Sequence, residues 1–137
     1  NAGACPQDAG PVAVIEPWIR AAESGRTTAA YFTLCNAQDR SDALIAVRTN
    51  AAAAVELHET ARSADGVVSM TRKDAFELPP SELVALAPGG AHIMLIGVEN
   101  ALTPESVVAL TLEFRNSPPV SIEAEVRGAG EAGHHAH

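Results

Sequence analysis

The chain has 137 residues, which is enough for one domain with its own hydrophobic core. Its composition is 47% hydrophobic but only 4% aromatic, so we expect a core built mainly from valine, leucine, isoleucine and alanine. The formal net charge of -8 argues against a nucleic-acid partner, because phosphate binding needs a basic surface. No apolar run approaches the roughly 20 residues that cross a bilayer, so we predict no transmembrane segment.

Residues 1–11 are predicted to form an N-terminal arm. The chain opens at Asn1 rather than Met, which is typical of a processed product that has lost a secretory signal, so we expect an extracytoplasmic location. The two cysteines, Cys5 and Cys35, do not form a CxxC motif. In an oxidising compartment we expect them to form a disulfide that holds the arm against the strand around Cys35. A buried free thiol at Cys35 and lipid attachment at Cys5 are the open alternatives.

Residues 12–127 are predicted to form a single all-β domain. Alternating or β-branched segments recur along the chain, and clusters of Gly, Pro, Asn and Asp divide them, which is typical of a β-sandwich or Greek-key barrel. The predicted strands are Val12–Arg20, Ala29–Asn36, Ala43–Thr49, Ala54–Thr60, Val67–Arg72, Phe76–Leu78, Glu82–Leu86, Ala91–Val98, Val107–Arg115 and Val120–Arg127. The alanine run after Asn50 is the one competing helix signal, and it is too short to stand alone, so we predict a turn or at most one helical turn there.

Two histidines and two methionines form the most informative pattern in the chain. They are His58, Met70, His92 and Met94, and they include both methionines of the sequence. Thioether sulfur is a soft, uncharged ligand that selects monovalent copper, while imidazole accepts copper in either oxidation state. The pattern therefore predicts a Cu(I) site that holds the ion without adding charge to it.

Strand alternation places the four side chains consistently. His58 alternates with Leu57, so it is expected to point away from the core. His92 and Met94 are two residues apart, so both project from one face of a strand, while Ile93 and Leu95 face the core. A turn at residues 88–90 is expected to bring His92 near the end of its strand, where solvent can reach it. A hairpin turn at residues 65–66 would bring Met70 beside His58.

The last ten residues, 128–137, are predicted to be a flexible His-rich tail, because they are almost entirely Gly, Ala and His without an apolar period. Several imidazoles suit the harder oxidation state of copper, so the tail is a second candidate site, for Cu(II). The alternative is an inert extension. The three tail ligands would be His134, His135 and His137.

The stretches 55–60 (VELHET), 65–70 (DGVVSM) and 86–97 (LAPGGAHIMLIG) resemble the PCuAC family of periplasmic copper chaperones. Flanking pieces agree, at residues 17–21 (PWIRA), 29–32 (AAYF) and 108–114 (VALTLEF), so the resemblance covers about residues 12–127. It implies a cupredoxin-like Greek-key β-sandwich that binds Cu(I) through the four predicted ligands, all of which are present. It also implies a periplasmic location and delivery of copper to the CuA centre of cytochrome c oxidase.

Other metal sites and activities fit the sequence less well. A blue-copper electron-transfer site needs a Cys thiolate beside its histidines, and Cys35 has no His-rich ligand loop around it. Zinc prefers Cys, His and carboxylate to thioethers. No GxSxG elbow, phosphate loop or HExxH motif is present, so we expect a binding protein and not an enzyme.

The sequence thus predicts a monomeric Cu(I) chaperone that passes copper to an accepting protein, either the CuA subunit or another copper chaperone. Copper storage or resistance without a dedicated delivery target is the alternative function. A metal-dependent enzyme is a weaker one. Lipid anchoring is left open.

Overall fold

The computed structural model describes residues 10–128, and every regular element among them is a β-strand. Within this part of the chain, no helix is long and apolar enough to cross a membrane. The strands are β1 (Val12–Arg20), β2 (Thr28–Asn36), β3 (Asp42–Arg48), β4 (Ala52–Arg62), β5 (Val68–Lys73), β6 (Phe76–Leu78), β7 (Leu83–Ala85), β8 (Ala91–Val98), β9 (Val107–Phe114) and β10 (Val120–Arg127).

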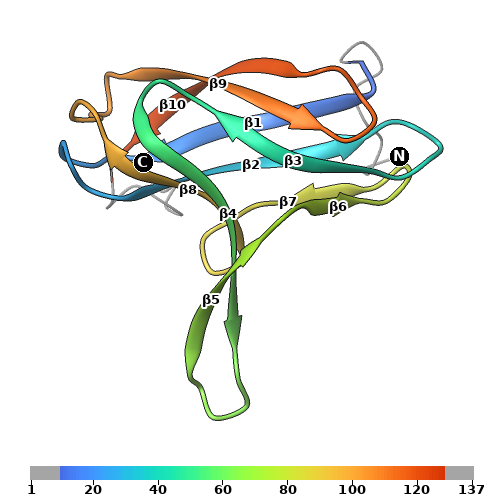
Figure 1. The fold of residues 1–137 in the computed structure, drawn as a ribbon, viewed down its shortest axis with the longest axis horizontal. Coiled ribbons are helices and arrows are strands. Elements are labelled where there is room, and N and C mark those ends of the chain that lie inside the picture. Colours follow the sequence, from blue (N-terminus) through green and yellow to red (C-terminus); the bar gives the residue numbers. More distant parts are fainter. Residues whose placement is uncertain (1–9, 129–137) are drawn as a thin grey trace, which may run out of the picture.

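The strands form one continuous hydrogen-bonded ladder that curls around a common core (Figure 1). Its order is β5-β4-β8-β2-β1-β10-β9-β3-β6, and β7 also pairs with β2. All neighbours are antiparallel except β1 and β10, which run parallel. The predicted all-β, cupredoxin-like β-sandwich is confirmed, and all ten predicted strands are present with bounds that differ by two residues at most.

A bulge in β1 allows the strand to contact both of its neighbours. The register with β2 shifts between Ile15 and Trp18, and Glu16 between them has a positive φ of 52°. Pro17 follows and has no backbone N–H to donate to a ladder. The bulge bends the strand, so its second half, which ends at Arg20, pairs with β10 as well as with β2.

Aliphatic side chains fill the core, as the composition predicts. Along β9, Val108, Leu110 and Leu112 are buried while Val107 is exposed, which is the alternation expected when one face of a strand packs inward. Burying such side chains contributes about 1.5–3 kcal/mol each. The large aliphatic side chains that are fully buried are Ile19, Leu34, Leu44, Leu78, Ile93, Leu95, Leu110 and Leu112.

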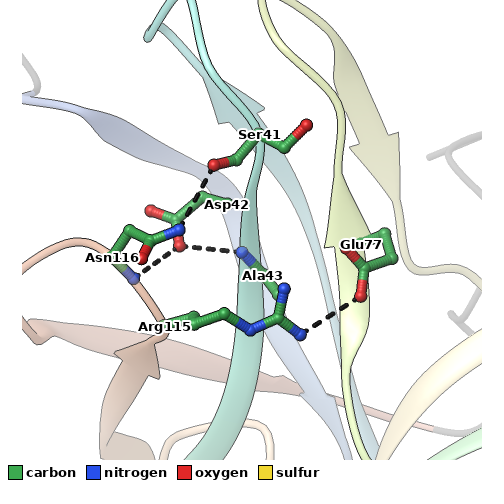
Figure 2. Close-up of polar contacts among 6 residues, drawn as sticks. All are labelled: Ser41, Asp42, Ala43, Glu77, Arg115 and Asn116. Carbon is green, nitrogen blue, oxygen red and sulfur yellow. Dashed lines mark hydrogen bonds and ion pairs between the residues drawn. The ribbon is translucent and has the colours of Figure 1, made fainter.

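A buried carboxylate connects β3 to the turn after β9 (Figure 2). One oxygen of Asp42 accepts hydrogen bonds from the backbone N–H groups of Ala43 and Asn116, at 2.8 Å each. The other oxygen accepts hydrogen bonds from Gln38 and Ser117. Burial raises the pKa of Asp42, but the four hydrogen bonds outweigh it and hold the pKa below its ordinary value.

The β4–β5 hairpin stands out from the body of the domain (Figure 1). Residues Ala52–Glu59 of β4 pair with β8, while Leu57–Arg62 pair with β5 on the other side. All six residues of β5 are exposed. The hairpin therefore carries its outer strand away from the core.

One local prediction is wrong. Ala52 and Ala53, expected in a turn or a helical turn, belong to β4, and Ala52 pairs with Val98 of β8. Alanine has a high helix propensity, but the long-range ladder with β8 overrides it.

Candidate metal centre

The β4–β8 register places the two predicted histidines directly opposite each other. His58 is the cross-strand partner of His92, and the neighbouring pair, Leu57 and Ile93, faces the core. Residues opposite each other in an antiparallel pair share a face, so both imidazoles lie on the face away from that core pair. Their ring centroids are 5.8 Å apart and their planes differ by 28°.

The two methionines lie on the same face as the histidines. Met94 follows His92 by two residues in β8, so its side chain leaves the strand on the same side. Met70 of β5 is the cross-strand partner of Thr60, which follows His58 by two residues in β4. The ladder therefore brings all four predicted ligands to one face of three adjacent strands.

A pocket of about 400 Å³ opens on this face. Met70, His92 and Met94 line it, together with Arg20 and Tyr31. His58 is not among the lining residues, and its ring stacks on the ring of His92. Within the described part of the chain, the residues that line the pocket include no aspartate or glutamate.

In each imidazole one ring nitrogen donates a hydrogen bond to a neighbouring oxygen, and the other ring nitrogen keeps its lone pair. Nε2 of His58 lies 2.8 Å from a carboxylate oxygen of Glu56, two residues earlier in β4. A carboxylate can only accept, so Nε2 carries the proton and Nδ1 has the lone pair. This Nδ1 is buried and has no hydrogen-bond partner. The hydrogen bond from His58 holds the pKa of Glu56 below its ordinary value, and the charge of Arg72 adds to the effect.

The imidazole of His92 also has one donating nitrogen and one nitrogen with a lone pair. Nδ1 of His92 lies 3.2 Å from the carbonyl oxygen of Gly90, which can only accept, so Nδ1 donates and Nε2 keeps the lone pair. Metal-binding histidines almost always donate their other N–H to a carboxylate or a backbone carbonyl in this way. Both imidazoles are thus prepared to offer one lone pair to a metal ion.

The donor set fits a soft ion better than a hard one. Within residues 10–128 there is no group of three or more His, Cys, Asp or Glu side chains that could hold a metal. Two neutral imidazoles and two neutral thioethers instead match the preference of Cu(I).

Exposure increases from the histidines to the hairpin. His92 is 5% exposed and the side chain of His58 is 14% exposed, whereas Met70 is 56% exposed. His92 itself is buried, because Tyr31 and His58 pack around its ring, so solvent reaches the site through the pocket that His92 lines. Met70 is the solvent-facing member of the set.

Two side chains beside this site carry roles that the sequence analysis did not assign. Glu56 contacts His58, and its spacing of two residues, which places both side chains on one face of the strand, could have indicated the contact. Arg20 lines the pocket from β1, far away in the sequence, and no local pattern predicts that. Burial raises the pKa of Tyr31, and the nearby charge of Arg20 partly offsets this.

The other predicted sites lie partly or wholly outside the described residues. Cys35 is fully buried in β2, but Cys5 precedes the described range, so the disulfide stays a prediction. The tail histidines, His134, His135 and His137, also lie outside the described residues.

Comparison with known proteins identifies the family. Residues 12–126 match the family model described as "Putative lipoprotein LpqE-like". The chain belongs to this family. It is also 32% identical over 123 residues to "Putative lipoprotein Lxx21020" of Leifsonia xyli subsp. xyli, covering 88% of this chain and 74% of that protein.

Solved PCuAC domains share the fold. The copper-bound PCuAC domain from PmoF2 superposes with a TM-score of 0.73 at 31% identity, covering 87% of this chain and 94% of that one. The apo PCuAC domain from PmoF1 gives a TM-score of 0.75 at 28% identity, with coverage of 87% and 95%. The solution structure of CuI-DR1885 from Deinococcus radiodurans gives 0.66 at 26% identity, with coverage of 88% and 83%. The predicted membership of the PCuAC family is confirmed.

Proposed function

We propose that this protein is an extracytoplasmic copper chaperone that binds one Cu(I) ion and passes it to a partner protein. His58, Met70, His92 and Met94 are the proposed ligands. The observation that carries the proposal is the pair of adjacent imidazoles, each with one nitrogen fixed by a hydrogen bond and the other available. The copper-bound PCuAC domain from PmoF2 and CuI-DR1885 support the same ion.

The gradient of exposure supports transfer by ligand exchange. The buried imidazoles would keep the ion in place, while the thioether of Met70, on the exposed strand β5, is the ligand that an incoming group reaches first. A thioether is a weak donor without charge, so its displacement costs little. Copper would therefore leave the protein on the side of the β4–β5 hairpin.

The relatives support the proposed location, and the resemblance of the sequence to the PCuAC family is the ground for the proposed acceptor. The two lipoprotein descriptions support an extracytoplasmic location, and we propose the periplasm or an equivalent compartment. We propose the CuA subunit of cytochrome c oxidase or another copper chaperone as acceptor. The protein would act as a monomeric carrier and not as an enzyme.

Anaerobic Cu(I) titration with X-ray absorption tests the ligand set directly. One bound ion with both nitrogen and sulfur neighbours is expected, and Met70→Leu should lose sulfur scattering. Val68→Leu is the matched control, because Val68 lies on the same exposed strand and offers no donor. Equal affinity for Zn(II) and Cu(I), or an unchanged sulfur signal in Met70→Leu, would contradict the proposal.

The His-rich tail is proposed as a separate Cu(II) site. A chain that ends at Gly128 should lose one Cu(II) equivalent and keep the Cu(I) equivalent, because imidazoles alone suit the harder ion. Paired Cu(II) and Cu(I) titrations of both lengths make the comparison. Unchanged Cu(II) binding after truncation would make the tail an inert extension.

A further inference from the structure

Arg20 is a cation held beside the proposed copper ligands. It ends β1 and lines the same pocket as Met70 and Met94. Its guanidinium carbon lies 5.7 Å from the ring centroid of Tyr31, and that ring lies 6.3 Å from the ring of His92. The aromatic face therefore holds the positive charge at the wall of the pocket that His92 also lines.

The guanidinium of Arg20 has no glutamate or aspartate paired with it among the described residues. Arg48, Arg115 and Arg127 each form an ion pair with a glutamate, whereas Arg20, like the remaining four arginines, forms none within residues 10–128. Its Nε is buried and donates to nothing in the same range. The chain has 17 acidic residues against 9 basic ones, so a shortage of carboxylates does not explain this.

Among the described residues, the lining of the pocket offers no negative charge to face the charges present once copper is bound. Cu(I) on four neutral ligands keeps its charge of +1, and the Arg20 guanidinium faces the same space. Glu56, the carboxylate that holds His58, is not among the residues that line the pocket, and neither is any other carboxylate of residues 10–128. A monoanion placed between them would be attracted to both, and an anion with a soft donor atom would satisfy Cu(I) as well.

We propose that the pocket between Arg20 and the copper ligands binds the thiolate that removes copper from this protein. The inference rests on the proposed chaperone function. The incoming thiol releases its proton to solvent, and its sulfur forms a bond to Cu(I) while the bond from copper to Met70 breaks. Copper stays Cu(I) throughout. Arg20 donates to the sulfur and favours the thiolate over the thiol.

The chain offers a closely matched control. Arg127 lies 5.2 Å from the ring of Trp18, much as Arg20 lies over Tyr31, but it does not line the pocket and it pairs with Glu125. Arg20→Gln and Arg127→Gln therefore remove the same charge and the same kind of aromatic contact. Arg20→Lys keeps the charge but changes the hydrogen-bonding group, and it is the variant to measure if Arg20→Gln folds poorly.

Anion binding is measured first on the apoprotein, by NMR titration with thiocyanate, a soft monoanion. Wild type and Arg127→Gln should show saturable shifts at the Arg20 Nε and at pocket residues, and Arg20→Gln should not. Absence of these shifts in the wild type overturns the inference, even if copper binding is intact. If the wild type shows them but binds no Cu(I), the proposed chaperone function fails on its own.

Transfer is then followed by stopped flow from the Cu(I)-loaded protein. The acceptors are glutathione, a cysteine-containing peptide and a methionine-containing peptide without cysteine. Arg20→Gln should slow transfer to thiolate acceptors about tenfold, the effect of losing one charge-assisted hydrogen bond, and Arg20→Lys should restore part of the rate. Transfer to the methionine peptide should not change, and Arg127→Gln should behave as wild type.

Slowing with glutathione alone supports a small-molecule thiol as the natural ligand, and slowing with the peptide as well supports a protein cysteine. Equal slowing in Arg20→Gln and Arg127→Gln, or equal slowing for the thiolate and thioether acceptors, overturns the proposal.

Discussion

Asp42 and His58 are both polar side chains with little exposure, and they differ in how their hydrogen-bonding atoms are satisfied. One oxygen of Asp42 accepts hydrogen bonds from two backbone N–H groups (Figure 2), and the other accepts them from two side chains. His58 has one nitrogen bound to Glu56 and one buried nitrogen with no partner. A buried polar group without a partner costs free energy unless a ligand satisfies it. The Asp42 network therefore has the properties of a structural element, and the His58 region has those of a binding site.

Arg115 and Arg20 differ in the same way, because one has a charged partner and the other has none among the described residues. Arg115 near the Asp42 network pairs with Glu77 at 3.2 Å, while Arg20 in the pocket has no such partner within the described chain. Unsatisfied groups thus gather on the face formed by β1, β2, β4 and β8, and satisfied ones lie at β3, β6 and β9. Substitutions in the two regions should have opposite effects on stability and on copper binding.

The largest expected effect is on stability, from Asp42→Ala. This substitution leaves two buried backbone N–H groups and two side-chain donors without their acceptor, and should lower the free energy of unfolding by about 4 kcal/mol. Urea denaturation measures the loss, and Cu(I) affinity of the folded protein should not change. A loss of copper affinity with stability intact would contradict the structural role.

His58→Phe should lower Cu(I) affinity without lowering stability, the reverse of the outcome for Asp42→Ala. Phenylalanine keeps the ring against His92 but offers no lone pair, so Cu(I) affinity should fall by at least about 100-fold, the upper range for loss of an outer supporting residue. Competition with a Cu(I) chelator under anaerobic conditions measures this. The apoprotein should unfold at or above the wild-type temperature, because a partnerless buried nitrogen is removed.

Glu56→Ala should weaken Cu(I) binding about tenfold, because Nε2 of His58 loses the carboxylate that orients the ring. Glu59→Ala is the control. Glu59 is the next glutamate in β4, is exposed, and pairs with Lys73 at 3.7 Å instead of contacting a histidine. The same chelator competition compares the two, and equal effects would indicate a general loss of negative charge.

Met94→Leu should change stability by less than about 1.5 kcal/mol, because leucine conserves most of the volume, while Cu(I) affinity falls. Thermal unfolding and chelator competition on one preparation give both numbers. A large loss of stability with unchanged copper affinity would instead make Met94 a packing residue.

The smallest effect is confined to acid pH. The pKa of Asp42 is lowered in the folded protein, so its ionisation contributes stability that is present above the unfolded-state pKa of about 3.9. That contribution is lost as the pH falls through the folded-state pKa. The difference in unfolding free energy between wild type and Asp42→Asn should therefore be constant near neutral pH and shrink only below about pH 3.9. A difference that already shrinks between pH 7 and pH 5 would point to another group.

Much of this protein follows from its sequence, because the signals are local. Alternation and turn residues predicted the bounds of β1, β6, β8 and β10 without error, since strand periodicity and turn chemistry need no knowledge of the partner strand. Donor chemistry alone selected the four candidate ligands, and alternation within β8 placed Ile93 and Leu95 in the core and His92 on the other face.

Only the tertiary structure decided the features that depend on long-range register. The pairing of β4 with β8 made Ala52 a strand residue, set His58 against His92 and buried the second imidazole, all through residues far apart in the sequence. The approach of β1 brought Arg20 to the same pocket and left its Nε without a partner. The sequence gives the donor and acceptor groups of each side chain. Which of these polar atoms remain without a hydrogen bond depends on every strand that packs around them.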